Sequence, residues 1–331
     1  AVAKDDALPD GARTVAELLS AKGSRTAGVV TNYNLAPDFN FQQGFDDYRY
    51  LTPRYFLGAD DTTAKLALYQ IFRLVHERYF TGAHEVDRYY PDAKRTTDEG
   101  LDWLDRHRTA EPGRPFLLWV QYMDPHDPYF AHDGTSDVFG HAIDPNPPKD
   151  KRDRILELYR QEIRFTDEHI GRLLDGLRER GLLDNTVVVL WSDHGEEFQD
   201  HGDWWHGTTL YDELVHIPLI VRPPRAEPRV GGDRPPLKLK QLDVPGWVSL
   251  VDVPYTILEE AGYTPAELAG FGQQGADLLL PRAQPLVFME EDHQGNVLRA
   301  LRWTDASGQA YKFIQAQEIM DSHHHAHGDA Y

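Results

Sequence analysis

The sequence predicts an α/β protein in which a central, largely parallel sheet is flanked by helices and followed by a small C-terminal antiparallel subdomain. Two observations predict this architecture. Short apolar runs, typical of buried parallel strands, are separated by stretches whose apolar residues recur with helical spacing. The last part of the chain instead alternates short apolar runs with charges, which is typical of antiparallel strands. The expected strands are Thr26–Val30, Phe116–Tyr122 and Val187–Trp191, and the expected helices are Thr14–Lys22, Thr62–His84, Thr96–Arg106 and Arg154–Arg180.

Length and composition indicate an acidic, folded protein. The chain has 331 residues, of which 40% are hydrophobic, a formal net charge of −20 and no cysteine. This length can bury one large core with a small appended subdomain, so we expect an α/β core over 1–280 and a small α+β subdomain with a tail over 281–331. Disulfides are excluded, and the negative charge argues against a general nucleic-acid binder and against adhesion to anionic lipid.

No apolar stretch reaches membrane-spanning length, and the first residues, AVAKDDALPDG, show no signal-peptide pattern. We therefore expect a soluble protein. The cytoplasm and the periplasm both stay open as compartments, and a homo-oligomer stays open as the assembly.

The first expected strand ends in polar residues. Gly23 stops the first helix, and strand Thr26–Val30 then leads into Asn32 and Asn34. These asparagines are either ordinary turn residues or members of a polar cluster at the carboxyl end of a strand, where α/β proteins bind ligands. The aromatic, glycine-containing segment Phe39–Tyr50 is expected to pack against the core.

The second expected strand also runs into a polar loop. Phe116–Tyr122 is followed by MDPHDPY, in which prolines on both sides of His126 restrict the backbone. A lone histidine in such a loop is either a surface or capping residue, or an imidazole held rigidly for function. Asp124 and Asp127 are expected to orient the loop.

A long loop and the strongest helical pattern follow. Residues 131–150 are rich in Gly, Pro and Asp and are expected to form a substrate-facing excursion. The helix at Arg154–Arg180 is stopped by Gly181, and we expect Asp167 and His169 to be surface or supporting groups on it. Its apolar residues are Ile155, Leu158, Ile163, Ile170, Leu173, Leu174 and Leu177.

The third expected strand carries the densest polar cluster. Val187–Trp191 is directly followed by Asp193 and His194, at the strand end where chemistry is usually done. Carboxylates and imidazoles within one short loop can bind a divalent cation. The alternative is a solvated acidic turn. The same loop continues with His201, Asp203, His206, Thr208 and Thr209.

The remainder of the chain returns to the core and then changes character. The run at 222–240 is either a proline- and arginine-rich linker or a basic rim for an anionic substrate. Trp247–Ala261 is expected to lead from a turn or strand into a helix, and Pro285–Ile314 to form a small antiparallel sheet. Arg299, Arg302 and Lys312 are expected to point outward from that sheet. Histidines in the tail at 322–331 are expected in a disordered terminus.

Several of these motifs resemble one family. SDHGEEF and HGTTLYDELVHIPLIVRPP closely resemble the metal-binding segment of the sulfatase family, within the alkaline-phosphatase-like superfamily. MDPHDPY resembles the PHxPY segment of that family, and VSLVDVPYTIL resembles its VSLVDxxPTLL element. The resemblance extends more weakly over nearly the whole chain. It implies an alkaline-phosphatase-like fold and metal-dependent cleavage of a sulfate ester, on a small molecule or a glycan.

The resemblance also implies roles for single residues. Asp193 and His194 would hold the metal, which would be Ca²⁺, with Mg²⁺ and Mn²⁺ as alternatives. His126 would protonate the leaving oxygen, and His206 would contact the sulfuryl group. Asn32, Asn34 and Thr208 would bind substrate, although Asn32 and Asn34 stand where many sulfatases have a lysine and a histidine.

The chain departs from the family pattern in its nucleophile. No Cys or Ser stands in a C/S-x-P-x-R motif, so formylglycine cannot form in this chain, and two further metal aspartates of the family are not found. We expect that an N-terminal segment carrying them is absent from this sequence. The alternatives are that the segment is a separate chain, or that the protein is a non-catalytic relative that binds sulfated or phosphorylated glycans.

Other chemistries stay open within and beyond the superfamily. A phosphodiester or phosphonate hydrolase, or a phosphoglycerol transferase, would use the same kind of metal pocket. An unrelated zinc hydrolase using His194, His201 and His206 is disfavoured, because their spacing differs from the helical HExxH arrangement.

Overall fold

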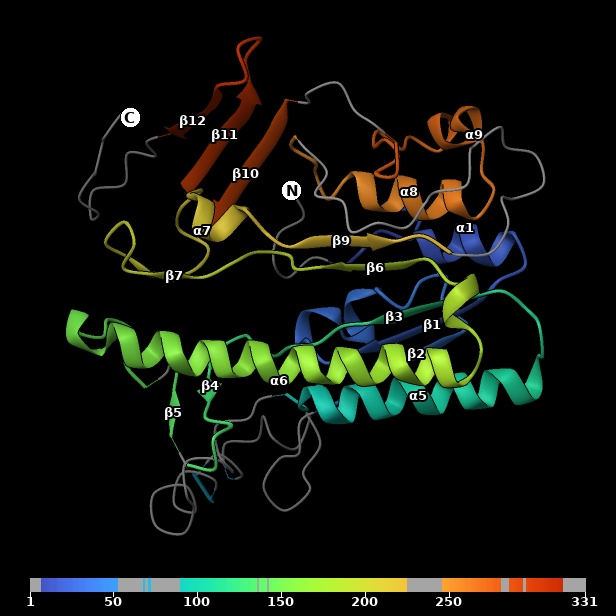
Figure 1. Ribbon diagram of the computed structural model, residues 1–331, viewed down its shortest axis with the longest axis horizontal. Coiled ribbons are helices and arrows are strands. Elements are labelled where there is room, and N and C mark those ends of the chain that lie inside the picture. The colour runs from blue at the N-terminus through green and yellow to red at the C-terminus, as the bar shows by residue number, and fades with distance from the viewer. Residues whose placement is uncertain are drawn as a thin grey trace. The chain divides into compact units, whose positions relative to one another are not determined.

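The structure is a computed structural model that describes residues 7–52, 68, 71–72, 90–135, 137–141, 143–224, 246–280, 286–293 and 296–317. These residues divide between two compact units, the first ending at Gly181 and the second beginning at Leu182 (Figure 1). Three predicted features lie wholly or mostly outside the described residues: the helix at 62–84, the run at 222–240 and the histidine-containing tail.

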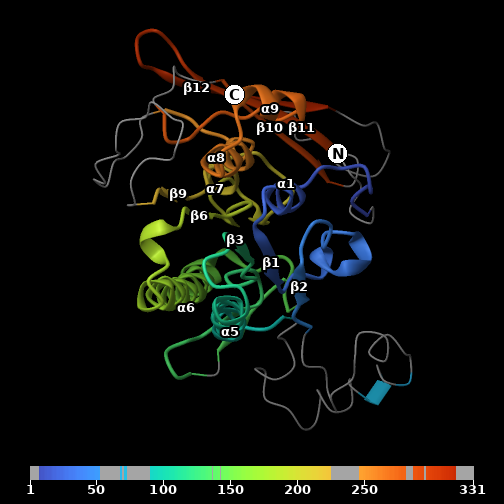
Figure 2. The ribbon, with the colours of Figure 1, turned by 90° about the vertical axis from the view of Figure 1, so that its right-hand side faces the viewer.

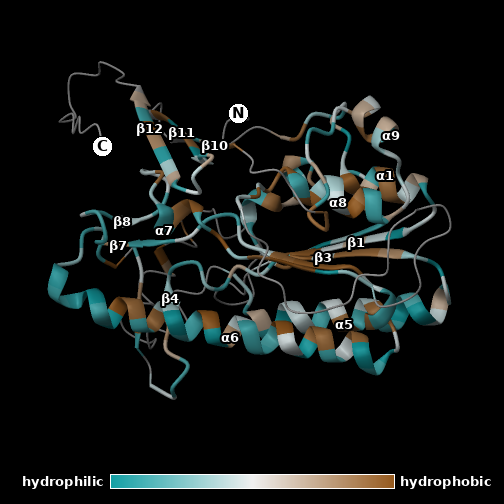
Figure 3. Cartoon of the chain, turned by 45° about the horizontal axis from the view of Figure 1, so that its top comes forward, coloured by the Kyte–Doolittle hydropathy of each residue, from teal (hydrophilic) through white to brown (hydrophobic). Residues whose placement is uncertain are grey.

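The first unit is built on a parallel three-stranded sheet in the order β2-β1-β3. The strands are β1 Arg25–Val30, β2 Asp47–Tyr50 and β3 Phe116–Val120. Val30, at the end of the central strand, is 0% exposed, and Figure 3 shows β1 and β3 as a largely apolar centre. Both predicted strands are confirmed. The segment Phe39–Tyr50, expected only to pack, contributes the third strand.

Helices cover both faces of this sheet. Figure 2 shows α1 on one face and the pair α5 and α6 on the other. Their bounds are α1 Val15–Ala21, α5 Ala93–Ala110 and α6 Arg152–Glu179, so the three predicted helices are confirmed. The two long helices approach closely because α6 carries a glycine at the contact. A Cβ added to Gly176 would lie 2.2 Å from the side chain of Leu101.

Local signals set the ends of α1. Thr14 accepts a hydrogen bond from the Glu17 amide at 3.1 Å, and the Glu17 carboxylate accepts one from the Thr14 amide at 2.9 Å. This capping box satisfies two backbone donors at the helix start. Gly23, with φ of +92°, then lets the chain turn away as predicted.

One expectation on α6 is wrong, because Ile163, counted with the apolar face, is 42% exposed. His169, expected as a surface or supporting group, is 6% exposed, which leaves the supporting role. The physical reason is the packing of α6 on α5. His169 lies toward α5, where its carbonyl accepts a hydrogen bond from Thr97 at 3.2 Å, and its ring packs edge-on against Phe165.

The loop at 131–150 is more structured than predicted. A short antiparallel pair, β4 Tyr129–Phe130 and β5 Val138–Phe139, anchors it. Two side chains of α6 bind this pair and the residues after it: Glu162 accepts from the Phe130 amide at 2.8 Å, and Gln161 accepts from the His132 amide at 2.7 Å. The excursion therefore starts from a fixed base on α6.

The second unit contains the strand predicted at Val187–Trp191. This strand, β6, pairs antiparallel with β9, and its side chains are only half-buried. The expectation of a strand buried on both faces of a parallel sheet is not met in this pairing, because the chain returns as a neighbouring strand after the polar loop between them. The elements are η5 Leu183–Asn185, β6 Val188–Trp191, β7 Glu197–Phe198, β8 Trp204–Trp205, α7 Asp212–Val215, β9 Leu219–Arg222, α8 Asp252–Glu260 and α9 Pro265–Gly270.

A three-stranded antiparallel sheet follows, as predicted. Its strands are β10 Val287–His293, β11 Asn296–Thr304 and β12 Ala310–Gln317. The prediction that Arg302 and Lys312 point outward is wrong: their side chains are 17% and 16% exposed and both bind Asp212. Strand alternation explains the difference, because these residues share the face of the buried Ala300, while Arg299 lies on the opposite face and is 53% exposed.

None of the helices in the described segments combines the length and the apolar character that crossing a membrane requires. The division of the chain into a core over 1–280 and a subdomain over 281–331 stays a prediction.

Candidate functional site

The polar loop after β6 is held by its own backbone. The Gly195 amide donates to the Leu214 carbonyl at 2.7 Å, and the Ser192 hydroxyl donates to the His194 carbonyl at 2.6 Å. A Cβ added to Gly195 would lie 2.0 Å from the Glu213 carbonyl oxygen, which is far inside contact distance. Only glycine therefore allows the loop to approach α7 this closely.

Asp193 and His194 present an oxygen and a nitrogen close together. His194 Nδ1 lies 2.7 Å from the Gly195 carbonyl oxygen, so this nitrogen carries a hydrogen, and in the neutral ring Nε2 carries the lone pair. Nε2 lies 4.0 Å from Asp193 Oδ2, and the Asp193 side chain is 83% exposed. Protein ligands lie about 2.0–2.6 Å from a divalent cation. The two atoms are therefore spaced so that one ion could contact both, and they supply two of the six or more ligands that Ca²⁺ takes.

His206 lies directly against this pair. Its ring stacks on that of His194, with centroids 4.2 Å apart and planes 26° apart. Its Nδ1 lies 3.0 Å from Glu196 Oε1, and the Glu196 side chain is buried. A carboxylate on Nδ1 fixes the orientation of the ring and leaves Nε2 as the nitrogen directed away from Glu196. The sequence predicts His206 as a site residue. It does not single out Glu196, because a second glutamate follows directly in the motif.

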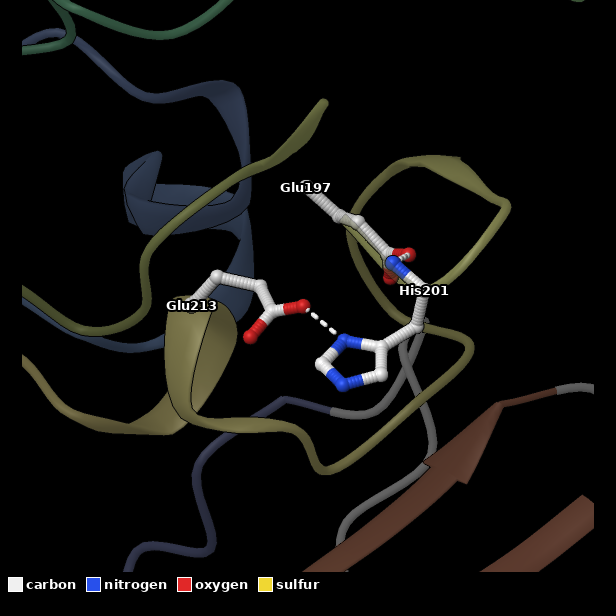
Figure 4. A group of neighbouring side chains, drawn as sticks. All are labelled: Glu197, His201 and Glu213. Carbon is white, nitrogen blue, oxygen red and sulfur yellow. Dashed lines mark hydrogen bonds and ion pairs between the residues drawn. The ribbon is translucent and has the colours of Figure 1, made fainter. Parts of the chain in front are cut away.

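A second group of possible metal ligands lies in the same loop. One atom each from Glu197, His201 and Glu213 falls within 4.8 Å of the others, and Figure 4 shows the His201 ring pointing at the Glu213 carboxylate. His201 Nδ1 and the Glu213 carboxylate share a hydrogen bond, and the His201 ring stacks on that of Tyr211 with centroids 3.8 Å apart. His201 appears among the predicted candidates. Glu197 and Glu213 are not among those candidates, because their closeness to His201 is visible only in the folded structure.

Glu197 is already engaged within that group. Its carboxylate accepts from the amides of His201 and Asp203, both at 3.2 Å, and from the Thr209 hydroxyl at 3.3 Å. Burial raises the pKa of Glu197 above its ordinary value despite these hydrogen bonds. These contacts tie the ends of the β7–β8 turn together, which is a structural task.

The first unit holds His126 in a closely constrained loop. His126 Nδ1 lies 2.7 Å from the Asp127 carbonyl oxygen, and the Tyr90 hydroxyl donates to the His126 carbonyl at 2.6 Å. Asp127 also accepts from the His141 amide at 2.9 Å, and Asp124 is buried. Asp127 therefore binds within the loop, and an orienting role for the two aspartates stays a prediction.

Asn32 and Asn34 form a turn at the end of β1. The Asn32 side chain accepts from the Asn34 amide at 2.9 Å, and the Asn32 amide donates to Gln121 at 3.0 Å. Asn34 is exposed. The structure thus shows the turn, and a role in substrate binding stays a prediction.

The predicted site residues belong to both units. Asp193, His194, His206 and the exposed Thr208 belong to the second unit, and the structure brings the first three of these together. His126, Asn32 and Asn34 belong to the first unit.

A family model for sulfatases matches residues 2–263. The chain therefore belongs to the sulfatase family. It is 26% identical over 269 residues to the uncharacterized sulfatase YidJ of Escherichia coli K12, which covers 72% of this chain and 50% of that protein. It is 27% identical over 236 residues to mouse arylsulfatase K, which covers 71% of this chain and 35% of that protein. The chain thus spans half or less of the length of these curated relatives.

Solved structures share the alkaline-phosphatase-like fold. A phosphonate monoester hydrolase from Silicibacter pomeroyi matches 97% of this chain and 77% of its own, with a TM-score of 0.59 and 16% identity. The structure of the protein BT4656, solved in complex with its substrate D-glucosamine-2-N,6-O-disulfate, matches 94% of this chain and 77% of the BT4656 chain, with a TM-score of 0.54 and 16% identity. At these identities the likeness shows the fold alone.

Proposed function

We propose that this chain is the core of a sulfatase-family hydrolase that cleaves a sulfate ester with the help of a divalent cation. The observation that carries the proposal is the grouping of Asp193, His194 and His206 at the end of β6, in a chain that belongs to this family.

Asp193 and His194 would hold the cation, which would neutralise charge on the sulfuryl oxygens. We propose Ca²⁺ by family, with Mg²⁺ and Mn²⁺ as alternatives, because the exposed Asp193 carboxylate is a hard oxygen ligand. His206, held by Glu196 through Nδ1, would direct Nε2 to a sulfuryl oxygen, to which it would donate a hydrogen bond as the imidazolium. Thr208 would add a hydroxyl contact to the substrate.

His126, Asn32 and Asn34 would supply the proton and further polar contacts, as the family resemblance implies. His126 would act as the general acid for the leaving oxygen, since its loop holds the imidazole through Asp127. Asn32 and Asn34 would offer neutral amides to the substrate. The substrate would be a small-molecule or glycan sulfate ester; a relative 33% identical over 127 residues is the N-acetylglucosamine-6-O-sulfatase of Bacteroides thetaiotaomicron.

A second candidate function is hydrolysis of a phosphonate or phosphodiester. Asn32 and Asn34 stand where many relatives place cations, and the phosphonate monoester hydrolase shares the fold over 97% of this chain. A non-catalytic relative that binds such anions without turnover is the remaining alternative.

The test is a substrate panel on the full chain, comparing an aryl sulfate, an aryl phosphonate and an aryl phosphodiester with and without added calcium. The proposal expects calcium-dependent release of the phenol from the aryl sulfate. Preference for either phosphorus ester would establish the second function instead. Binding of sulfated sugar without any product would identify the non-catalytic relative.

A further inference from the structure

Two cations of the C-terminal sheet meet a single carboxylate on α7. Asp212, the first residue of α7, accepts from Arg302 at 2.5 Å and from Lys312 at 2.8 Å. Arg302 on β11 and Lys312 on β12 stand directly opposite each other in the strand register. Like charges opposite each other destabilise a sheet, so this pair needs the carboxylate between them.

Arg302 is held from a second side. Its guanidinium lies 3.6 Å from the ring centroid of Trp247, and the Trp247 Nε1 donates to the Thr304 hydroxyl at 3.2 Å. A guanidinium over an indole face is a favourable cation–π arrangement. Burial alone would raise the pKa of Asp212, but its hydrogen bonds with Arg302 and Lys312 and their charges hold that pKa below its ordinary value.

Helix α7 in turn determines the position of the loop after β6. The carbonyls of Glu213 and Leu214 accept from the amides of Glu196 at 3.1 Å and Gly195 at 2.7 Å. The contact is so close that a Cβ at Gly195 would overlap the Glu213 carbonyl oxygen. A displacement of α7 would therefore displace the residues that directly follow Asp193 and His194.

We infer that Arg302 and Lys312 are positioning residues for the Asp193–His194 loop. By binding Asp212 from two strands of the C-terminal sheet, they fix α7, and α7 fixes the backbone of Gly195 and Glu196. The inference rests on the proposed function only in that Asp193 and His194 hold the metal. The physical coupling from the sheet to the loop stands apart from the identity of the substrate.

The first test is amide hydrogen exchange on the full, metal-free chain, followed in peptides that cover residues 192–198. Arg302→Met and Lys312→Met keep the aliphatic stems of the side chains and remove the charges. Each is expected to accelerate exchange at Gly195 and Glu196 about tenfold while exchange in α8 is unchanged. Arg299→Met is the matched control, because Arg299 lies on the opposite face of the same strand and pairs with the exposed Glu290. It should change neither segment.

Asp212→Asn removes the negative charge shared by the two cations and must give the same local acceleration, so the inference stays testable if one cation variant does not fold. Unchanged exchange at 192–198 in the variants that fold, or acceleration spread equally over α8, would overturn it. If Arg302 and Lys312 only stabilised the unit as a whole, exchange would accelerate equally at 192–198 and in α8.

The second test is calcium affinity by isothermal titration calorimetry on the same proteins. The two cation variants are expected to bind calcium about tenfold more weakly than the wild type and Arg299→Met, a loss of about 1.4 kcal/mol. If the wild type binds no calcium, the proposed metal site fails and the exchange result alone decides the positioning. If calcium binding requires Asp193 but neither exchange nor affinity responds to Arg302 and Lys312, the positioning fails alone.

Discussion

The rings of His194 and His206 stack with centroids 4.2 Å apart, which joins a candidate metal ligand to a candidate substrate contact. The two residues come from different ends of the loop between β6 and α7. Glu196 holds His206 from the other side through Nδ1. His194 Nε2 faces Asp193, and His206 Nε2 is directed away from Glu196, which is the basis for proposing a separate task for each imidazole.

His206→Phe should separate these tasks. Phenylalanine keeps the ring stack but removes both nitrogens, so calcium affinity should be unchanged. The turnover of the hydrolysed ester should fall about 10²–10³-fold, as expected for loss of one donor to a charged oxygen. His206→Gln, which retains a donor, should recover part of the rate. Steady-state kinetics with calorimetry decide, and loss of calcium binding in His206→Phe would instead make His206 a metal ligand.

Gly195→Ala should destabilise the loop after β6. The added Cβ would overlap the Glu213 carbonyl at 2.0 Å, so the free energy of unfolding should fall by about 1–3 kcal/mol, as in other overpacked sites. Gly171→Ala on α6 is the contrasting variant, because a Cβ there meets no atom within 4 Å. It should raise stability by about 0.5–1 kcal/mol. Urea unfolding measures both, and equal effects of the two changes would contradict the close approach of the loop to α7.

His126→Ala tests the general acid. The rate should fall about 10²–10⁴-fold with metal retained, and the loss should be smaller for esters with acidic leaving groups, which need no proton. His141→Ala, an exposed histidine whose amide binds the same Asp127, should leave the rate unchanged. A rate for His126→Ala equal to that of the wild type would remove His126 from the mechanism.

The pH dependence of stability should reveal Asp47 of β2. Burial would raise the pKa of Asp47, but hydrogen bonds from Trp103 and Arg25 outweigh it and hold that pKa below 3.8, the ordinary value. A depressed pKa stabilises the fold above the unfolded-state value, and this contribution disappears as the pH falls through the folded-state pKa. The carboxylate is partly exposed, so solvent screening keeps the contribution to about 1 kcal/mol.

The corresponding variant is Asp47→Asn. The difference in free energy of unfolding between wild type and Asp47→Asn should be constant at neutral pH and shrink as the pH drops below 3.8. Asp38→Asn, at an exposed position, serves as the control. A difference that grows on acidification would contradict the assigned sign.

The elements that the sequence predicts are those with strong local signals. The apolar run of β1, the capping box of α1 and the long periodic pattern of α6 each determine their own structure. Strand pairing is less visible, because it depends on where the chain returns. This is why the antiparallel partner of β6 and the short pair β4–β5 were not predicted.

The same distinction applies to the site. Asp193, His194 and His206 lie within one motif and were predicted together. Glu196 and Glu197 look alike in sequence, yet one carboxylate binds an imidazole and the other binds backbone amides. The inward direction of Arg302 and Lys312 depends on Asp212, which lies 90 and 100 residues away along the chain. No local pattern reports such a partner.

The most direct measurement is the metal content of the purified chain by elemental mass spectrometry after calcium incubation. The account predicts about one calcium per chain, lost in Asp193→Ala and kept in Glu213→Gln. Calcium kept in Asp193→Ala but lost in Glu213→Gln would place the ion at Glu197, His201 and Glu213. Either that result or a wild-type chain without calcium would contradict a metal site at Asp193 and His194.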